Sequence, residues 1–215
     1  KDTLFAIGSL TKGFTGLLAT MLVNEGRFSW SETLTTLLPP GTPLSADAAK
    51  ITLEQLATHT SGLPRQPITE QTLLYFVQYL FTGDNFYRHF DRKFVLEYLK
   101  RFSAPKVSEP AYSNIGYGIL VYALELRTGK SIDILLAERI AGPLGLTHTT
   151  FSPHVLPGFD ERAIGYAGDQ PKFVGRGQPV PDWNFTDLLR GAAGLYSSAN
   201  DLLTCAAAHL RKNRN

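Results

Sequence analysis

Apolar residues recur three and four positions apart along most of this chain, which is the spacing of a helix with one buried face. The first run, from Leu10 to Leu22, predicts a helix that ends near Gly26, because glycine readily adopts the left-handed conformation that closes a helix. The capping-box sequence at residues 29–32 predicts the start of a short second helix. Further helices are predicted over residues 52–58, 70–81, 92–102, 114–127, 131–140 and 199–210.

Strand patterns are scarce in this sequence. Residues 4–7 are apolar and indicate the end of a short buried strand, which Gly8 breaks. Residues 150–190 are rich in Gly, Pro and Asp and are expected to be irregular, including the stretch 173–180, where glycine and proline argue against a strand. A helix-rich chain without a sheet of its own indicates that part of a larger architecture is absent.

Composition narrows the classes of function. The 215 residues suffice for one large domain or two small ones, and 43% hydrophobic and 19% charged residues are ordinary for a globular protein. The net charge of +2 is spread along the chain, which argues against nucleic acid as a partner. No apolar run reaches the ~18 residues of a membrane span. One cysteine, and histidines without metal-ligand spacing, predict no internal disulfide, no metal site and no cofactor.

The first candidate for chemistry is Ser9 with Lys12, in the run Gly8-Ser9-Leu10-Thr11-Lys12. A serine hydroxyl needs a neighbouring base to act as a nucleophile at neutral pH. Residues three apart share a helix face, and a lysine in a dry pocket near other cations favours its neutral form. The start of the helix also offers N–H groups to a developing oxyanion. We therefore interpret Ser9 as a nucleophile and Lys12 as its partner.

This Ser-x-x-Lys pattern is short, and it occurs a second time at Ser103-Ala104-Pro105-Lys106. The second match contains a proline and falls in a predicted loop, so its side chains are not fixed on one helix face. We interpret it as a chance match.

The second candidate is Tyr112-Ser113-Asn114, directly before an apolar helix. A tyrosine beside an ammonium group releases its proton more easily, so Tyr112 is a candidate base toward serine and acid toward a leaving group. Asn114 both donates and accepts, which suits contact with a substrate amide and with the lysine. The alternative is a tyrosine that packs on the helix start, with the asparagine as a cap.

A third element, a Lys-Thr-Gly or His-x-Gly strand that completes an oxyanion hole, is not found. Arg127-Thr128-Gly129 imitates it but ends a predicted helix, and His59-Thr60-Ser61-Gly62 falls in a turn. We interpret His59 as a structural hydrogen-bonding residue. Trp183 is expected to be a packing residue and is a candidate for lining a cleft.

Five short stretches of the sequence are each weak signals, but together they are specific for one family. They are residues 5–15, 51–64, 112–117, 143–146 and 191–202. In their order they resemble the serine β-lactamase family, in its class C branch, with the related DD-peptidases and esterases. The resemblance implies that Ser9 is acylated, that Lys12 and Tyr112 transfer protons and that Asn114 contacts the substrate amide. It also implies that the protein acts in the periplasm or outside the cell.

The fold expected from this resemblance is the α+β fold of the β-lactamase/DD-peptidase-like serine hydrolases. Residues 1–215 are then the helical part of a single β-lactamase-like domain, truncated at both ends, so that the chain is mainly α and most of the antiparallel sheet is missing. Large exposed apolar surface is expected as a result, with self-association as one consequence.

Three functions stay open at this point. The first is hydrolysis, through an acyl-enzyme, of a β-lactam, a D-Ala-terminated peptide or a small ester, so the expected partner is a small molecule or peptide. The second is a penicillin-binding sensor that is acylated without efficient turnover. The third is a folded but poorly active piece, because one oxyanion donor and the third motif are missing.

Overall fold

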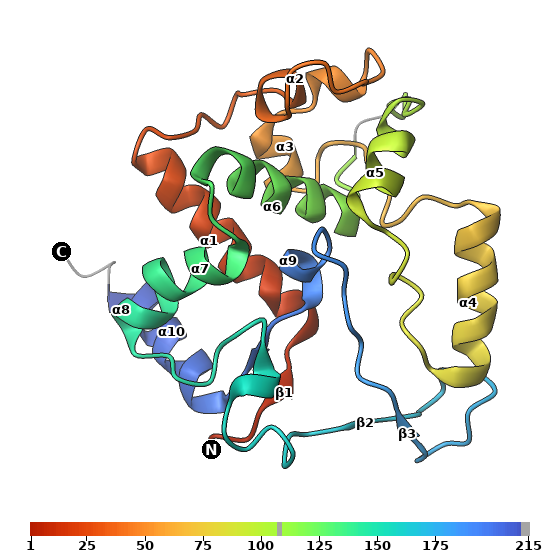
Figure 1. Cartoon of the computed structure of the whole chain (residues 1–215), viewed down its shortest axis with the longest axis vertical. Coiled ribbons are helices and arrows are strands. Elements are labelled where there is room, and N and C mark those ends of the chain that lie inside the picture. Colours follow the sequence, from red (N-terminus) through yellow and green to blue (C-terminus); the bar gives the residue numbers. More distant parts are fainter. Residues whose placement is uncertain (107–108, 212–215) are drawn as a thin grey trace.

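The computed structural model describes residues 1–106 and 109–211. Two long helices, α1 (Thr11–Asn24) and α6 (Asn114–Thr128), pack against each other at its centre (Figure 1). Helix α6 buries ten of its fifteen residues and forms the middle of the hydrophobic core. Helix α1 buries Phe14, Leu18 and Leu22, as its apolar spacing predicts.

Shorter helices and turns surround this central pair. They are α2 (Leu34–Leu37), α3 (Leu53–Ala57), α4 (Glu70–Thr82), α5 (Arg92–Leu99), α7 (Ile132–Leu136), α8 (Gly142–Leu144), α9 (Arg190–Ala193) and α10 (Ala199–Arg211), with the 3-10 turns η1 (Gly8–Leu10), η2 (Ala48–Lys50) and η4 (Pro153–Val155) and the π-helical turn η3 (Ala137–Ala141). Polar side chains at the helix starts accept backbone N–H bonds, as Thr52 does at α3 and Ser131 at α7. The helices predicted from apolar spacing are thus present.

The predicted start of the second helix is wrong. Ser29 N–H donates to Glu32 Oε1 at 2.7 Å, which is half of a capping box. Residues 30–31 nevertheless form a turn, and α2 begins only at Leu34. The backbone there is held by long-range pairing instead, because Leu34 N–H donates to Ile51 O at 2.8 Å.

Strands are few in the described chain, as expected. Strand β1 (Phe5–Ala6) pairs antiparallel with β4 (Tyr196–Ser197), and β2 (Gly165–Tyr166) pairs antiparallel with β3 (Pro179–Val180). The second pair lies in the stretch for which the sequence predicts no strand. The first pair matters for the site, because it brings the segment after α9 alongside the residues that precede Ser9.

Helix α9 lies in close contact with both central helices because of Gly191. A Cβ atom at this position would lie 2.1 Å from Val121 Cγ2 on α6. On the other side, Thr15 Oγ1 of α1 donates to Gly191 O at 2.7 Å. Glycine therefore permits a three-helix contact that fixes the backbone of α9 next to Lys12.

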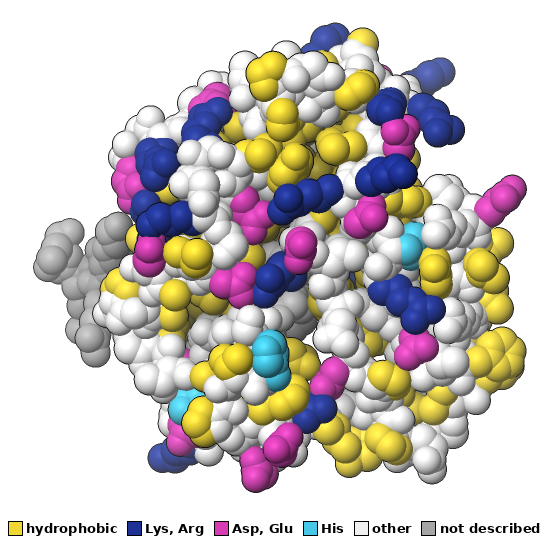
Figure 2. Space-filling model, viewed as in Figure 1, with side chains coloured by type: hydrophobic (Ala, Val, Ile, Leu, Met, Phe, Trp, Pro, Cys, Tyr) yellow, Lys and Arg dark blue, Asp and Glu magenta, His cyan; other side chains and the backbone are white. Residues whose placement is uncertain are grey.

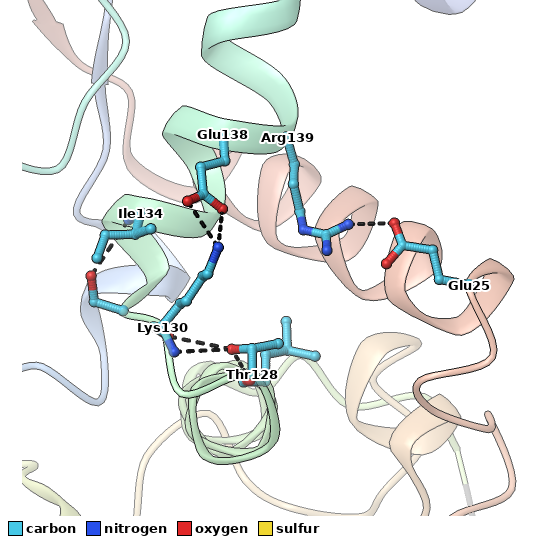
Figure 3. Close-up of polar contacts among 8 residues, drawn as sticks. Glu25, Thr128, Lys130, Ile134, Glu138 and Arg139 are labelled. Carbon is cyan, nitrogen blue, oxygen red and sulfur yellow. Dashed lines mark hydrogen bonds and ion pairs between the residues drawn. The ribbon is translucent and has the colours of Figure 1, made fainter.

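Ion pairs at the surface connect the end of α1 with the segment that follows α6. Figure 3 shows Glu138 bonded to Lys130, with Nζ–O distances of 2.8 and 2.6 Å, and Arg139 bonded to Glu25. Both carboxylates are substantially exposed, so these pairs orient η3 and contribute little to the free energy of folding.

Helix α4 stands at the edge of the molecule (Figure 1). Several of its apolar side chains are exposed. Figure 2 shows apolar side chains gathered over this part of the surface. We define the α4 patch as Leu73, Leu74, Val77, Phe81 and Phe173, the last of which stacks on Phe81. Among the described residues, no helix is long and apolar enough to cross a membrane.

Candidate active site

Ser9 lies on η1, between β1 and α1, with its side chain exposed. Gly8 adopts a left-handed φ of +51°, which lets the chain turn sharply out of the strand. Thr11 Oγ1 donates to Gly8 O at 2.6 Å and accepts from Leu195 N–H at 3.1 Å, so the turn is fixed from both sides. Ser9 is thus on a 3-10 turn that leads into α1, one turn earlier than the α-helix itself.

Lys12 is buried, with 6% of its surface exposed, and its amine has three polar neighbours. Nζ lies 2.9 Å from Asn114 Oδ1, 2.8 Å from Ala192 O and 3.5 Å from Ser9 Oγ. The structure therefore brings together Ser9 and Lys12, as the helical spacing predicts. It adds a backbone acceptor from α9 that the spacing does not reveal.

Tyr112 comes from the loop before α6 and reaches across to Ser9. Its hydroxyl lies 2.6 Å from Ser9 Oγ. Two cations lie close to its ring, since Lys12 Nζ is 4.6 Å and the Arg65 guanidinium 5.3 Å from the ring centre. The alternative in which this tyrosine only packs on a helix start does not describe these contacts.

Asn114 is the first residue of α6, and its side chain points to the site instead of capping the helix. The cap is Ser113, whose Oγ accepts from Gly116 N–H at 2.9 Å and donates to Pro64 O at 2.8 Å. Asn114 Oδ1 accepts from Lys12, and its Nδ2 donates to Tyr87 Oη at 3.2 Å. These two bonds fix the orientation of the amide.

The electrostatics of the site lower the pKa values of both Lys12 and Tyr112. Burial lowers the pKa of the Lys12 amine, with Tyr112 acting against this and Arg65 adding to it. Partial burial acts to raise the pKa of the Tyr112 phenol. Its polar contacts with Lys12 and Ser9, together with the charges of Lys12 and Arg65, outweigh that effect and lower this pKa. Both groups therefore lose a proton more easily than in water.

His59 supports the loop that carries Tyr112. Its Nδ1 accepts from Ser113 N–H at 3.1 Å, and its carbonyl accepts from Ala111 N–H at 2.8 Å. Its ring lies against Tyr112, at 4.6 Å between centres. Burial, with the charge of Lys12, lowers the pKa of His59, which favours the neutral form of the ring. This agrees with its interpretation as a structural hydrogen-bonding residue.

The second Ser-x-x-Lys match has a different environment. Ser103 Oγ lies 3.5 Å from Asp47 Oδ2, and the neighbouring Ala104 N–H donates to the same carboxylate at 2.9 Å. The segment follows α5 in an irregular conformation, so no helix face aligns Ser103 with Lys106. It provides a matched control for Ser9.

A cavity of about 790 Å³ opens at Ser9. Ser9, Asn114 and Arg65 line one part of it, and a group of aromatic residues lines another, namely Phe76, Tyr79, Phe86, Tyr87, Trp183 and Phe185. The volume is within the usual range of about 300–1,000 Å³ for small-molecule sites.

These features agree with a comparison against known families. The family model described as Beta-lactamase matches residues 1–215. The chain belongs to the Beta-lactamase family.

Relatives within the family are named for different activities. D-alanyl-D-alanine-carboxypeptidase/endopeptidase AmpH of Escherichia coli (strain K12) is 34% identical over 166 residues, which are 71% of this chain and 38% of that protein. Esterase EstB of Burkholderia gladioli is 27% identical over 226 residues, 94% of this chain and 56% of that protein. A class C beta lactamase from Rhodobacter sphaeroides has a TM-score of 0.70 at 28% identity, over 94% of this chain and 50% of that one.

These similarities confirm the predicted β-lactamase/DD-peptidase fold. The chain spans about half the length of the solved structure and of EstB, and less of AmpH.

The sequence patterns do not indicate two polar residues of this candidate site, Arg65 and Tyr87. Arg65 lies in a loop between two prolines, Pro64 and Pro67, which gives no periodic signal. Tyr87 follows α4 and meets Asn114 only through tertiary packing. Trp183, which the sequence indicates as a candidate for lining a cleft, does line the cavity.

Proposed function

We propose that this protein is a serine hydrolase in which Ser9 is the nucleophile and becomes acylated. The observation that carries the proposal is the set of contacts around Ser9 Oγ, with Tyr112 Oη at 2.6 Å and Lys12 Nζ at 3.5 Å. The pKa values of both neighbours are lowered, which suits a group that must accept the proton of serine.

In the first step Ser9 Oγ attacks the substrate carbonyl carbon while its proton passes to the base. Tyr112 as phenolate is the direct acceptor, because its oxygen is the nearer group. The carbonyl π-electrons move to the oxygen and form an oxyanion, which is stabilised by N–H groups at the start of the helix. Tyr112 then returns the proton to the leaving group as the carbon–leaving-group bond breaks, and an acyl-Ser9 ester results.

Lys12 has two roles that its hydrogen bonds allow. As an ammonium ion it donates to Asn114, Ala192 and Ser9, and its charge stabilises a Tyr112 phenolate. As a neutral amine it still donates to Asn114 and Ala192, and its lone pair faces Ser9. In the second case Lys12 itself takes the serine proton. The deacylating water is activated by the same pair in either case.

Asn114 is proposed to contact the substrate amide next to the reacting carbonyl. Its position on the cavity wall beside Ser9 supports this role. The bond from Nδ2 to Tyr87 and the bond to Oδ1 from Lys12 hold the side chain ready, at the cost of competing with a substrate for the same atoms.

Three substrate classes follow from the relatives: β-lactams, D-alanyl peptides and small esters. AmpH, at 34% identity, is a D-alanyl-D-alanine carboxypeptidase/endopeptidase by name, and EstB is an esterase by name. We propose the D-alanyl peptide first on this ground, in a protein that acts outside the cytoplasm. Residues 1–215 are proposed to be the helical part of one β-lactamase-like domain.

Intact-mass measurement after incubation with benzylpenicillin and, separately, with nitrophenyl acetate tests the proposal. We expect one acyl adduct in the wild type, none in Ser9→Ala and an unchanged adduct in Ser103→Ala. An equal adduct in Ser9→Ala contradicts the assignment. An adduct that persists for hours instead of decaying favours a penicillin-binding sensor over a hydrolase.

A further inference from the structure

The loop that carries Tyr112 is attached to one residue of the loop after α3, His59. Tyr112 itself is 41% exposed, so packing alone does not fix the direction of its hydroxyl. The backbone on each side of it is bonded to the histidine. Ala111 N–H donates to His59 O at 2.8 Å, and Ser113 N–H donates to His59 Nδ1 at 3.1 Å. The residue proposed to exchange a proton with Ser9 is therefore held between two bonds to a single side chain and its backbone.

The backbone of His59 has an unusual conformation. Its φ is +62°, and it is the one non-glycine residue with a positive φ among the residues that the structure describes. Strain of this kind persists only where the surrounding contacts hold it, and it is concentrated at functional sites. Here it allows the carbonyl oxygen and the ring of one residue to accept hydrogen bonds from the same loop.

The bond from Ser113 determines the protonation state of the ring. A backbone N–H can only donate, so Nδ1 of His59 accepts and the ring proton lies on Nε2. An imidazolium ion carries a proton on both nitrogens and has no acceptor to offer. Protonation of His59 and the bond that holds Ser113 therefore exclude each other.

The groups packed around the ring of His59 favour its neutral form. The ring of Tyr112 lies at 4.6 Å between centres and that of Tyr117, on α6, at 5.1 Å. Burial, and then the charge of Lys12 on α1, lower the pKa of the imidazole, and among the described residues no carboxylate opposes them. An imidazolium here would have aromatic rings and a cation as neighbours.

We propose that His59 is a positioning residue for the reaction: its neutral ring holds Tyr112 against Ser9, and protonation of the ring in acid releases Tyr112. The inference rests on the proposed function, because the position of Tyr112 matters through the proton that it exchanges with Ser9. Acylation then needs both a deprotonated acceptor and a neutral His59. The rate of acylation should therefore fall more steeply with falling pH once His59 gains its proton than it does above that pH.

Two variants separate the side chain of His59 from its strained backbone. His59→Asn keeps an acceptor, since Oδ1 takes the place of Nδ1, tolerates a positive φ and gains no proton in this pH range. His59→Gly tolerates the same backbone but has no acceptor. With nitrophenyl acetate, we expect the rate of Ser9 acylation to fall about 10²-fold in His59→Gly and less than about ten-fold in His59→Asn. Equal loss in the two variants overturns the role of the acceptor.

The pH profile of acylation is a readout that a merely structural histidine would not move. In His59→Asn the steeper acid limb should be absent. The matched control is His154→Asn, at an exposed histidine of η4, which should keep the steeper limb. A steep limb that persists in His59→Asn overturns the release of Tyr112 by protonation.

NMR of the uniformly ¹⁵N-labelled protein keeps the test independent of turnover. At neutral pH the His59 ring signals, assigned by their absence in His59→Asn, should show a proton on Nε2 alone. On acidification the Ser113 amide should shift with the same midpoint as the ring. A proton on Nδ1 at neutral pH, an amide that does not follow the ring, or a ring that gains no proton before the protein unfolds overturns the inference. If Ser9→Ala is acylated as the wild type is, the proposed function fails, while the NMR titration still decides whether His59 holds this loop.

Discussion

Tyr112 Oη lies 2.6 Å from Ser9 Oγ, whereas Lys12 Nζ lies 3.5 Å from the same oxygen. The longer distance from Lys12 to Ser9 has a structural reason, because the two shorter bonds of Nζ go to Asn114 and to the backbone of Ala192. From these distances we expect Tyr112 to be the main group that exchanges a proton with serine. Lys12 is expected to hold the site together and to supply charge, and to take the proton itself only when it is a neutral amine.

Tyr112→Phe keeps the ring and removes only the oxygen that meets Ser9. We expect the rate of Ser9 acylation to fall about 10²–10⁴-fold, the usual range for loss of a general base. The measurement is the rate of adduct formation by intact mass. Tyr117→Phe is the matched control, since its hydroxyl bonds to Ala57 O at 2.9 Å and not to Ser9. Acylation of Tyr112→Phe at the wild-type rate contradicts the assignment.

Arg65 is expected to shift the pH dependence of the site, as a smaller contribution beside burial and the contact between Lys12 and Tyr112. Its charge lowers the pKa of both Tyr112 and Lys12, so removing it raises both values. Acylation needs a deprotonated acceptor and therefore rises with pH. In Arg65→Gln the rising limb of the pH–rate profile for acylation should therefore move to higher pH.

The control for this experiment is Arg176→Gln, a highly exposed arginine near Asp169, which should leave the limb in place. High salt should move the wild-type limb in the same direction as Arg65→Gln, because it screens the guanidinium. A limb that stays fixed or moves to lower pH in Arg65→Gln shows that Arg65 does not tune the base.

Gly191→Ala tests the contact between α9 and the two central helices. The new methyl group would lie 2.1 Å from Val121 Cγ2, whose β-branched side chain is stiff on a helix. We expect a loss of about 1–3 kcal/mol in the free energy of unfolding. In Gly13→Ala nothing lies within 4 Å of the new atom, and we expect a gain of about 0.4–1 kcal/mol. Urea denaturation midpoints of the two variants and the wild type measure both effects. Equal stability of Gly191→Ala and Gly13→Ala contradicts the packing argument.

Local signals in the sequence predict the helices well. Thr52 forms the capping box that opens α3, and Gly129 ends α6 with a φ of +67°. Both are decided within one turn of chain, where propensity and hydrogen bonding are local. The predicted start of the second helix is wrong, because Leu34 N–H donates to Ile51 O and this long-range bond overrides the local capping signal.

The site is predictable only in part for the same reason. Ser9 and Lys12 meet because of helical spacing, which the sequence carries. The contacts of Lys12 with Ala192 and of Asn114 with Tyr87 join residues far apart in the chain, and nothing in local periodicity encodes them. The catalytic roles of Ser9, Lys12, Tyr112 and Asn114 stay predictions until the variants are measured.

The α4 patch is expected to make the protein self-associate. Leu74 is 67% and Phe81 59% exposed, and large contiguous apolar surface favours association. In sedimentation velocity, the wild type should shift to faster-sedimenting species as its concentration rises, and the double variant Leu74→Glu, Phe81→Glu should stay monomeric because burying the new charges is costly. Leu126→Glu, at an exposed leucine of α6, controls for added charge and should associate like the wild type. A wild type that is monomeric at every concentration contradicts the prediction, and association that survives in the double variant places the contact on another surface.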